Sequence, residues 1–304
     1  MRAFRIPLRT RFRGVMEREG VLLHGPHGWG EFSPFPEYGP ETARRWADAA
    51  LEAAAEPWPT PVRTSIPVNT TVPAVSPEEA FALVTRSGCT TAKVKVAEGD
   101  DEARVEAVRA ALGRSGKLRI DVNGRWDVDT AVKTIKTLDA YDLEYVEQPV
   151  ATLEEMARVR AAVDVPLAAD ESVRTAADPM RITGLEAADI VVLKVQPLGG
   201  VRRCMEVAEA CGLPVVVSSA VETSVGIAAG VALAAALPEL PYACGLGTIS
   251  LLEGDVVRES LVPVDGNLPV ARPEPDDASL GRWELSEAGS AEIFERFRMA
   301  ESVL

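Results

Sequence analysis

Short runs of β-branched residues alternate with alanine-rich segments from about residue 64 to residue 260. The alanine-rich segments have apolar positions spaced as on one face of a helix, whereas the β-branched runs have the length of strands. This alternation is typical of repeated strand–helix units around a parallel sheet. Eight strands are predicted, at Ile66–Val72, Thr91–Val96, Leu118–Val122, Leu143–Glu147, Val165–Asp170, Ile190–Lys194, Val215–Ser218 and Tyr242–Leu246.

The predicted helices carry start signals of their own. Ser76 is followed three residues later by Glu79, and Thr152 is followed at the same spacing by Glu155. A hydroxyl at the N-cap and a glutamate at the third helical position are typical of a helix start. Successive strand ends are 23 to 27 residues apart, which fits one strand and one helix per repeat. We therefore predict an α/β fold, a (β/α)8-type modified TIM barrel.

The two ends of the chain do not follow this repeat. The first 63 residues predict a strand hairpin and a helix, with strands at Phe4–Pro7, Val15–Gly20, Val21–His24 and Trp29–Phe32 and the helix at Thr42–Glu56. The tail has a proline-rich break at Pro269–Pro275 and a predicted helix at Ser286–Met299. We expect residues 1–63 and 261–304 to form one α+β capping domain, and residues 64–260 to form the barrel domain that carries the catalytic residues.

Composition narrows the classes of partner. The 304 residues include 46 acidic and 32 basic side chains, a net charge of −14, so binding to a nucleic-acid backbone is not expected. The most apolar stretch, Val225 to Leu237, is too short to span a bilayer. Four scattered cysteines and two histidines do not form a zinc or disulfide framework. We expect a cytoplasmic protein without a membrane partner, and the absence of a long apolar edge favours a monomer.

Charged side chains stand at the ends of five predicted strands. Residues alternate along Thr91–Val96, so Lys93 and Lys95 share one face, which points inward if the apolar residues pack on the helices. The next three strands each end in a carboxylate and the sixth ends in a lysine: Asp121, Glu147, Asp170 and Lys194. Because barrel strands end at the mouth where such enzymes place their chemistry, we expect all six side chains to face one cavity.

Three carboxylates that converge in one mouth repel each other unless a cation lies between them. Oxygen ligands with room for waters suit Mg²⁺, with Mn²⁺ as a possible substitute. The sequence therefore predicts that Asp121, Glu147 and Asp170 bind one Mg²⁺. Asn123 shares the face of Asp121 and could orient a ligand or line the pocket, and a role in a turn is an equally open interpretation.

Lysines on opposite walls of the barrel suggest a reaction class. Lys194 lies four strands from Lys95, so the metal would lie between them. This arrangement suits removal of a proton next to the carboxylate of a small-molecule substrate. Hydride and phosphoryl transfer are not expected, since no glycine-rich nucleotide-binding loop is present. A barrel that binds a partner without catalysis is the alternative class, but it has no evident use for two opposed buried lysines.

Together these motifs resemble the enolase superfamily, muconate-lactonizing subgroup. The resemblance covers nearly the whole chain and rests on Lys93-x-Lys95, Asp121-x-Asn123, Glu147-Gln148-Pro149, Asp170-Glu171-Ser172 and Lys194. It implies acid and base roles for Lys95 and Lys194 and a supporting role for Lys93. It also implies that a lysine acts as the base next to a bound Mg²⁺, an arrangement that is known in that superfamily.

A second set of segments resembles the o-succinylbenzoate synthase family of that subgroup; it comprises residues 28–42, 118–121, 217–226 and 245–248. This implies Mg²⁺-dependent syn-dehydration of 2-succinyl-6-hydroxy-2,4-cyclohexadiene-1-carboxylate. Ser218, Ser219 and Gly245 would then shape the substrate pocket, with Arg119 as a weaker candidate. N-succinylamino-acid racemisation, or another muconate-cycloisomerase-like reaction, remains open, because it uses the same two lysines.

Overall fold

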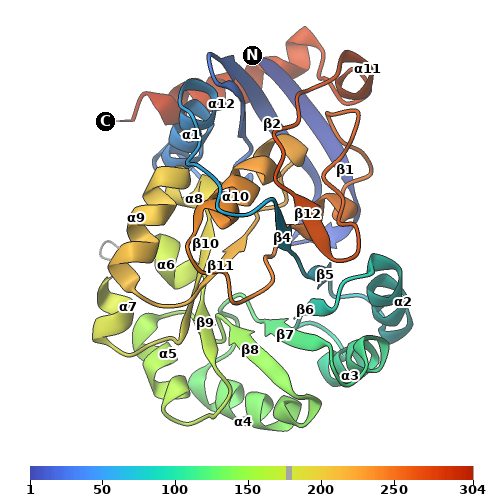
Figure 1. The fold of residues 1–304 in the computed structure, drawn as a ribbon, viewed down its shortest axis with the longest axis vertical. Helices are drawn as coiled ribbons and strands as arrows, with labels where there is room; N and C mark the ends of the chain where they lie inside the picture. Colours follow the sequence, from blue (N-terminus) through green and yellow to red (C-terminus); the bar gives the residue numbers. More distant parts are fainter. Residues whose placement is uncertain (176–179, 304) are drawn as a thin grey trace.

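A computed structural model describes residues 1–175 and 180–303 of the chain. Its largest feature is a curled, seven-stranded parallel sheet in which the strands follow one another in chain order (Figure 1). These strands are β5 (Thr70–Val72), β6 (Thr91–Lys95), β7 (Lys117–Asp121), β8 (Leu143–Glu147), β9 (Leu167–Ala169), β10 (Ile190–Lys194) and β11 (Val215–Ser218). The predicted barrel-type α/β class is confirmed.

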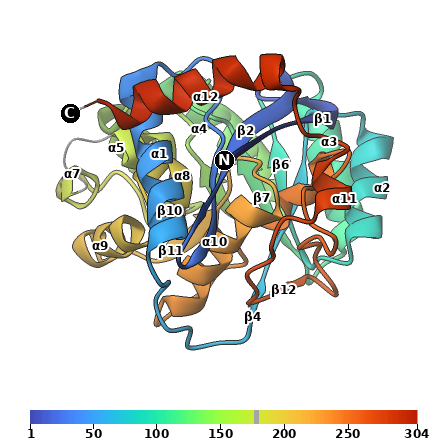
Figure 2. The ribbon, with the colours of Figure 1, turned by 90° about the horizontal axis from the view of Figure 1, so that it is seen from above.

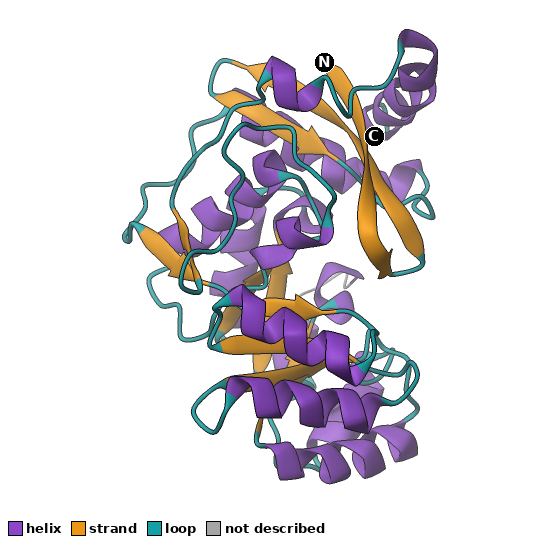
Figure 3. Ribbon diagram, turned by 90° about the vertical axis from the view of Figure 1, so that its right-hand side faces the viewer, coloured by secondary structure: helices purple, strands orange, loops and turns teal. Residues whose placement is uncertain are grey.

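Helices connect consecutive strands and cover the outside of the sheet (Figure 3). They are α2 (Pro77–Ser87), α3 (Asp101–Leu112), α4 (Val128–Leu138), α5 (Leu153–Arg160), α6 (Glu171–Thr175), α7 (Met180–Gly184), α8 (Val195–Leu198), α9 (Val201–Cys211) and α10 (Ser224–Ala236). Both predicted start signals are present: Ser76 accepts a hydrogen bond from the Glu79 amide, and Thr152 forms a full capping box with Glu155. Local sequence thus determines where these helices begin.

The predicted eighth strand at Tyr242–Leu246 is wrong. Only two residues of this segment pair with the sheet: Cys244 bridges Val68, and Gly245 bridges Ser218 at the end of β11. The predicted first strand is also interrupted. Its start forms β4 (Ser65–Pro67), which pairs with β12 (Asn267–Pro269) in place of the barrel, and Pro67 has no N–H with which to continue a ladder. Isolated bridges therefore join the two edges of the sheet.

Both ends of the chain build a second layer above the barrel (Figure 2). An antiparallel sheet of β1 (Arg2–Phe12), β2 (Val15–Gly25) and β3 (Gly28–Phe32) packs on α1 (Pro40–Ala55) and α12 (Glu287–Glu301). The first strand lies beside the segment that precedes α12, because the Arg5 amide donates to the Trp283 carbonyl at 2.9 Å. The two strands predicted within residues 15–24 form a single strand, β2.

The division into a capping domain of residues 1–63 and 261–304 and a barrel of residues 64–260 stays a prediction. Two observations bear on it. The tail helix α11 (Asp277–Leu280) and α12 lie beside the N-terminal sheet, whereas β12 pairs with β4 at the start of the barrel segment.

Two glutamates from the upper layer bind the N-termini of barrel helices. The Glu31 carboxylate accepts hydrogen bonds from the Thr223 and Gly226 amides at the start of α10, at 3.3 and 3.0 Å. The Glu52 carboxylate accepts from the Val201 amide of α9 at 2.8 Å. The first amides of a helix lack intrahelical partners, and their dipoles attract a negative charge. These contacts fix the upper layer over the mouth of the barrel.

Helix α10 contains the most apolar stretch of the sequence, and it is buried along its whole length. Its side chains therefore belong to the core. Within residues 1–175 and 180–303, no helix combines the length and the apolar character needed to cross a bilayer.

Candidate active site

The register of the parallel strands brings the predicted charged residues together. Lys95 on β6 pairs with Asp121 on β7, which in turn pairs with Glu147 on β8. Asp170 directly follows β9, and Lys194 is the last residue of β10. In the sheet order, the three strands that supply carboxylates lie between the two that end in Lys95 and Lys194. This is the arrangement that the sequence predicts.

Each carboxylate is buried and pairs with an ammonium group. Lys93 Nζ lies 2.7 and 2.8 Å from the two Glu147 oxygens and 3.2 Å from Asp121 Oδ2. Lys95 Nζ lies 2.5 Å from the same Asp121 oxygen, and Lys194 Nζ lies 2.5 Å from Asp170 Oδ2. Because all three carboxylates are at most 1% exposed, these pairs compensate charges that would otherwise be costly to bury.

Burial and the neighbouring charges act together on the pKa values of Lys95, Glu147 and Asp170, and the balance between them differs from group to group. Burial lowers the pKa of Lys95, and the nearby Lys93 and Lys194 ammonium groups add to the shift, although Asp121 opposes it. Burial raises the pKa of Glu147 to about 7, helped by the Asp121 charge. Burial would also raise the pKa of Asp170, but Lys194 and then Arg174 outweigh it and hold this pKa at about 2. A lysine with a lowered pKa is suited to accept a proton.

The three carboxylates have the chemistry of a metal site, but in this structure each one pairs with an ammonium group. In the described part of the chain, no group of three or more His, Cys, Asp or Glu side chains is arranged to hold a metal ion. Asp121, Glu147 and Asp170 nevertheless come from three adjacent strand ends and offer only oxygen ligands, which hard divalent cations prefer. Lysine side chains are long and flexible, so these residues fit a divalent cation once the ammonium groups move aside.

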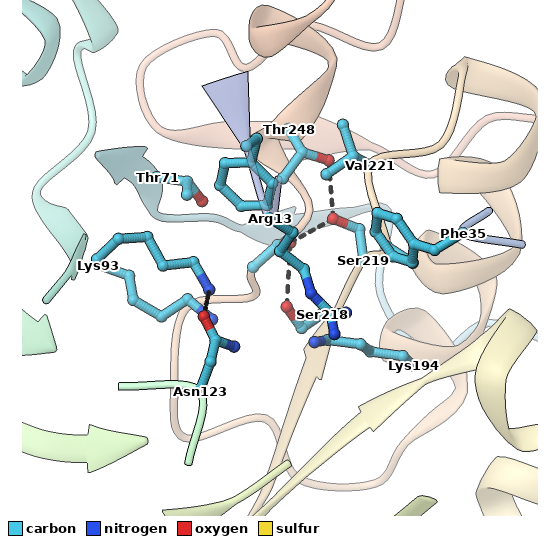
Figure 4. Close-up of a pocket in the computed structure, with 14 residues that line it drawn as sticks. Arg13, Phe35, Thr71, Lys93, Asn123, Lys194, Ser218, Ser219, Val221 and Thr248 are labelled. Carbon is cyan, nitrogen blue, oxygen red and sulfur yellow. Dashed lines mark hydrogen bonds between the residues drawn. The ribbon is translucent and has the colours of Figure 1, made fainter. Parts of the chain in front are cut away.

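A small cavity of about 20 Å³ opens directly above these charges (Figure 4). All three lysines line it, whereas the carboxylates lie behind them. This volume holds about one water molecule, so a substrate can enter only if some of the lining side chains move. The cover of the cavity includes Phe12 and Arg13 at the turn between β1 and β2, together with Phe35. A second cavity of about 220 Å³ shares Phe12, Arg13 and Lys95 with the small cavity. Two other arginines, Arg11 and Arg125, also line it.

Four of the five predicted substrate-binding residues line the small cavity: Asn123, Ser218, Ser219 and Gly245. Asn123 accepts a hydrogen bond from Lys95 Nζ at 2.8 Å and donates one to Glu171 at 3.2 Å. Ser219 Oγ donates to the Gly245 carbonyl at 3.0 Å and lies 2.7 Å from Thr248 Oγ1. A Cβ atom at residue 245 would lie only 2.4 Å from Ser218 Oγ, so a side chain here would displace the Ser218 hydroxyl.

Arg119 lies outside this group. Its side chain is fully buried deeper in the barrel, where the guanidinium pairs with Glu144 at 2.6 Å and stacks 4.7 Å from the Tyr145 ring centroid. It also donates to the Ala243 carbonyl at 2.7 Å. These contacts lie in the floor of the barrel, and the expected contact of Arg119 with substrate stays a prediction.

Seven further residues line the cavity and are not among the site residues predicted from the sequence: Phe12, Arg13, Phe35, Thr71, Ala220, Val221 and Thr248. One signal was available for the first two: Arg13-Gly14 lies between two predicted strands and forms a tight turn with φ values of 48° and 84°. The turn signal locates the tip of the hairpin, but it does not show which part of the molecule the tip faces.

Comparisons with known proteins agree with this geometry. Residues 76–276 match the family model described as enolase C-terminal domain-like, and residues 3–54 match the enolase N-terminal domain-like model. The chain is 64% identical to the o-succinylbenzoate synthase of Thermobifida fusca (strain YX), over 94% of this chain and 92% of that protein. It is 53% identical to the o-succinylbenzoate synthase of Mycolicibacterium smegmatis, over 93% and 89% of the two chains.

A solved structure shows the same fold. The muconate lactonizing enzyme from Pseudomonas fluorescens, complexed with muconolactone, aligns with a TM-score of 0.82 and 22% identity, over 93% of this chain and 97% of that chain.

Proposed function

Because the chain belongs to the o-succinylbenzoate synthase family of the enolase superfamily, we propose that it dehydrates 2-succinyl-6-hydroxy-2,4-cyclohexadiene-1-carboxylate to o-succinylbenzoate, a step of menaquinone biosynthesis. The protein is then a hydro-lyase. The observation that carries the proposal is the placement of Lys95 and Lys194 on either side of three buried carboxylates, at the mouth of a barrel.

Lys95 is the proposed base and acid. Burial lowers the pKa of Lys95 and so makes its ammonium group easier to deprotonate; the neutral amine accepts the proton from the ring carbon that bears the substrate carboxylate. The same ammonium group then gives this proton to the hydroxyl that leaves the neighbouring carbon. One proton and one hydroxide leave as water, and the ring becomes aromatic. Asn123 Oδ1, at 2.8 Å, orients the Lys95 Nζ atom.

Lys194 faces the substrate from the opposite side of the site, at the end of β10. Its positive charge stabilises the negative charge that develops on the substrate carboxylate after proton removal. Lys93 has a supporting role, since its ammonium group bridges Glu147 and Asp121 and its pKa is raised by them against the effect of burial.

The family's enzymes use a divalent metal, and we propose Mg²⁺ held by Asp121, Glu147 and Asp170. When bound, it supplies a positive charge that holds the substrate carboxylate and stabilises charge on its oxygens.

The direct test is turnover by the purified protein with Mg²⁺ present. We expect rapid conversion of the cyclohexadiene substrate, measured by absorbance of the aromatic product, and slow or no racemisation of N-succinyl amino acids in parallel reactions. Racemisation without dehydration would contradict the proposed substrate and leave the lysine and metal assignments standing. Absence of both reactions would contradict the enzymatic assignment.

A further inference from the structure

Arg18 on β2 is a fully buried cation whose role the reaction does not explain. Its side chain is 2% exposed. Within residues 1–175 and 180–303, no carboxylate lies within ion-pairing distance of it. The guanidinium instead binds backbone: Nε donates to the Val221 carbonyl at 3.2 Å, and Nη2 donates to the Ser33 carbonyl. It also stacks 4.1 Å from the centroid of the Phe35 ring.

These contacts join two walls of the small cavity that come from distant parts of the chain. Phe35 follows β3 in the upper layer, and Val221 lies between β11 and α10 in the barrel. Both side chains line the cavity (Figure 4). Arg18 itself is not among the lining residues. It therefore acts on the cavity only through the residues that it holds.

The Val221 backbone needs such support. Its φ angle is 63°, which is rare for a β-branched residue and persists only where the surroundings impose it. Two contacts hold the turn: the Arg18 donation to the Val221 carbonyl, and a 2.7 Å hydrogen bond from the Ala220 amide to Glu222 Oε2. A planar guanidinium can donate to two separated carbonyls while its flat face stacks on a ring, whereas a lysine ammonium has no flat face to stack.

We propose that Arg18 is a positioning residue that fixes Phe35 and Val221 as the walls against which substrate binds, and so determines the substrate affinity of the site. This rests on the proposed dehydration as the reaction that is measured. None of the described contacts of Arg18 reaches Lys95, Lys194 or the three carboxylates. Its loss should therefore weaken substrate binding and leave the chemical step nearly unchanged.

Steady-state kinetics of Arg18→Met, Arg18→Lys and Arg63→Met separate this role from a purely structural one. Arg63 is the matched control, because its guanidinium also binds only backbone carbonyls, those of Ala234, Leu237 and Pro238, none of which lines the cavity. We expect Arg18→Met to raise KM about tenfold with kcat within about threefold of wild type. Arg18→Lys should raise KM several-fold, and Arg63→Met should lower Tm without a change in KM.

An unchanged KM in Arg18→Met, or a fall in kcat alone, would overturn the proposal. If Arg18→Met does not fold, Arg18→Lys decides by the same criteria. Amide hydrogen exchange of residues 219–223 provides a measurement without substrate: we expect faster exchange in the Arg18 variants and wild-type exchange in Arg63→Met. If the wild type does not dehydrate its substrate, the proposed function fails, while unchanged exchange at residues 219–223 overturns the role of Arg18.

Discussion

If Asp170 holds the proposed divalent cation, Lys194 competes with that cation for the carboxylate, and this competition can be measured. Lys194 Nζ lies 2.5 Å from Asp170 Oδ2, and both side chains are buried. Lys194→Met removes the ammonium group but keeps an apolar side chain of similar length. Asp170 then loses its nearest cation and retains Arg174, whose Nε atom lies 3.7 Å away.

The size of the effect follows from the pKa of Asp170. This pKa is about 2, against an ordinary value of 3.8, because Lys194 and Arg174 outweigh the effect of burial. A difference of nearly two units corresponds to about 2 kcal/mol. Since the folded-state pKa is the lower one, this stabilisation is present above about pH 4 and is lost as the pH falls towards 2. At neutral pH we expect Lys194→Met to lose about 2 kcal/mol, or on the order of 4 °C in Tm.

Scanning calorimetry with EDTA, and then with Mg²⁺, tests this expectation. Mg²⁺ should raise the Tm of Lys194→Met more than that of wild type, and titration calorimetry should show roughly tenfold tighter Mg²⁺ binding, because the competing ammonium group is gone. Lys117→Met, which changes an exposed lysine at the start of β7, is the matched control and should behave as wild type. An unchanged Tm in EDTA, or equal Mg²⁺ effects on Lys194→Met and wild type, would refute the competition.

Three further predictions concern the base, the barrel floor and the contact between the layers. Burial lowers the pKa of Lys95, so kcat/KM should rise with pH to a plateau, through a pKa below the ordinary lysine value of about 10.4; a profile that is flat from pH 6 to 10 would argue against this base. Arg119→Met leaves Glu144 without its buried partner and should cost about 3 kcal/mol in urea unfolding without changing KM; a changed KM at wild-type stability would return Arg119 to the substrate site. Glu31→Ala removes the acceptor of two backbone amides at the start of α10 and should cost about 2 to 4 kcal/mol; a loss below about 0.5 kcal/mol would show that water replaces the carboxylate.

The sequence predicts the charged site well, because strand alternation and chain order determine it. Side chains two residues apart share a face of a strand, and parallel strands end at one edge. These two rules place Lys95, Asp121, Glu147, Asp170 and Lys194 around one mouth without knowledge of any loop.

Alternation does not determine depth along the barrel. Arg119 shares the inward face of Asp121, but it lies two residues earlier on β7, level with Lys93 and Tyr145. It therefore reaches the barrel floor. Lys93 starts from the same level, and its long side chain extends up to Glu147.

The cover of the cavity depends on contacts between residues far apart in the chain. Phe12, Arg13 and Phe35 reach the mouth because Glu31 and Glu52 bind the starts of α10 and α9. No pattern within residues 1–63 encodes those partners. The sequence pattern predicts an eighth strand at Tyr242–Leu246, but only Cys244 and Gly245 pair. A strand-like run does not show whether its backbone groups find partners in the fold.

The rate of o-succinylbenzoate formation by Lys95→Ala, relative to wild type at saturating Mg²⁺ and substrate, tests the central claim most directly. Loss of the only proposed base predicts a fall in kcat of about a thousandfold or more in a protein that still folds and binds Mg²⁺. Turnover at the wild-type rate by a folded, metal-binding Lys95→Ala protein would contradict the mechanism.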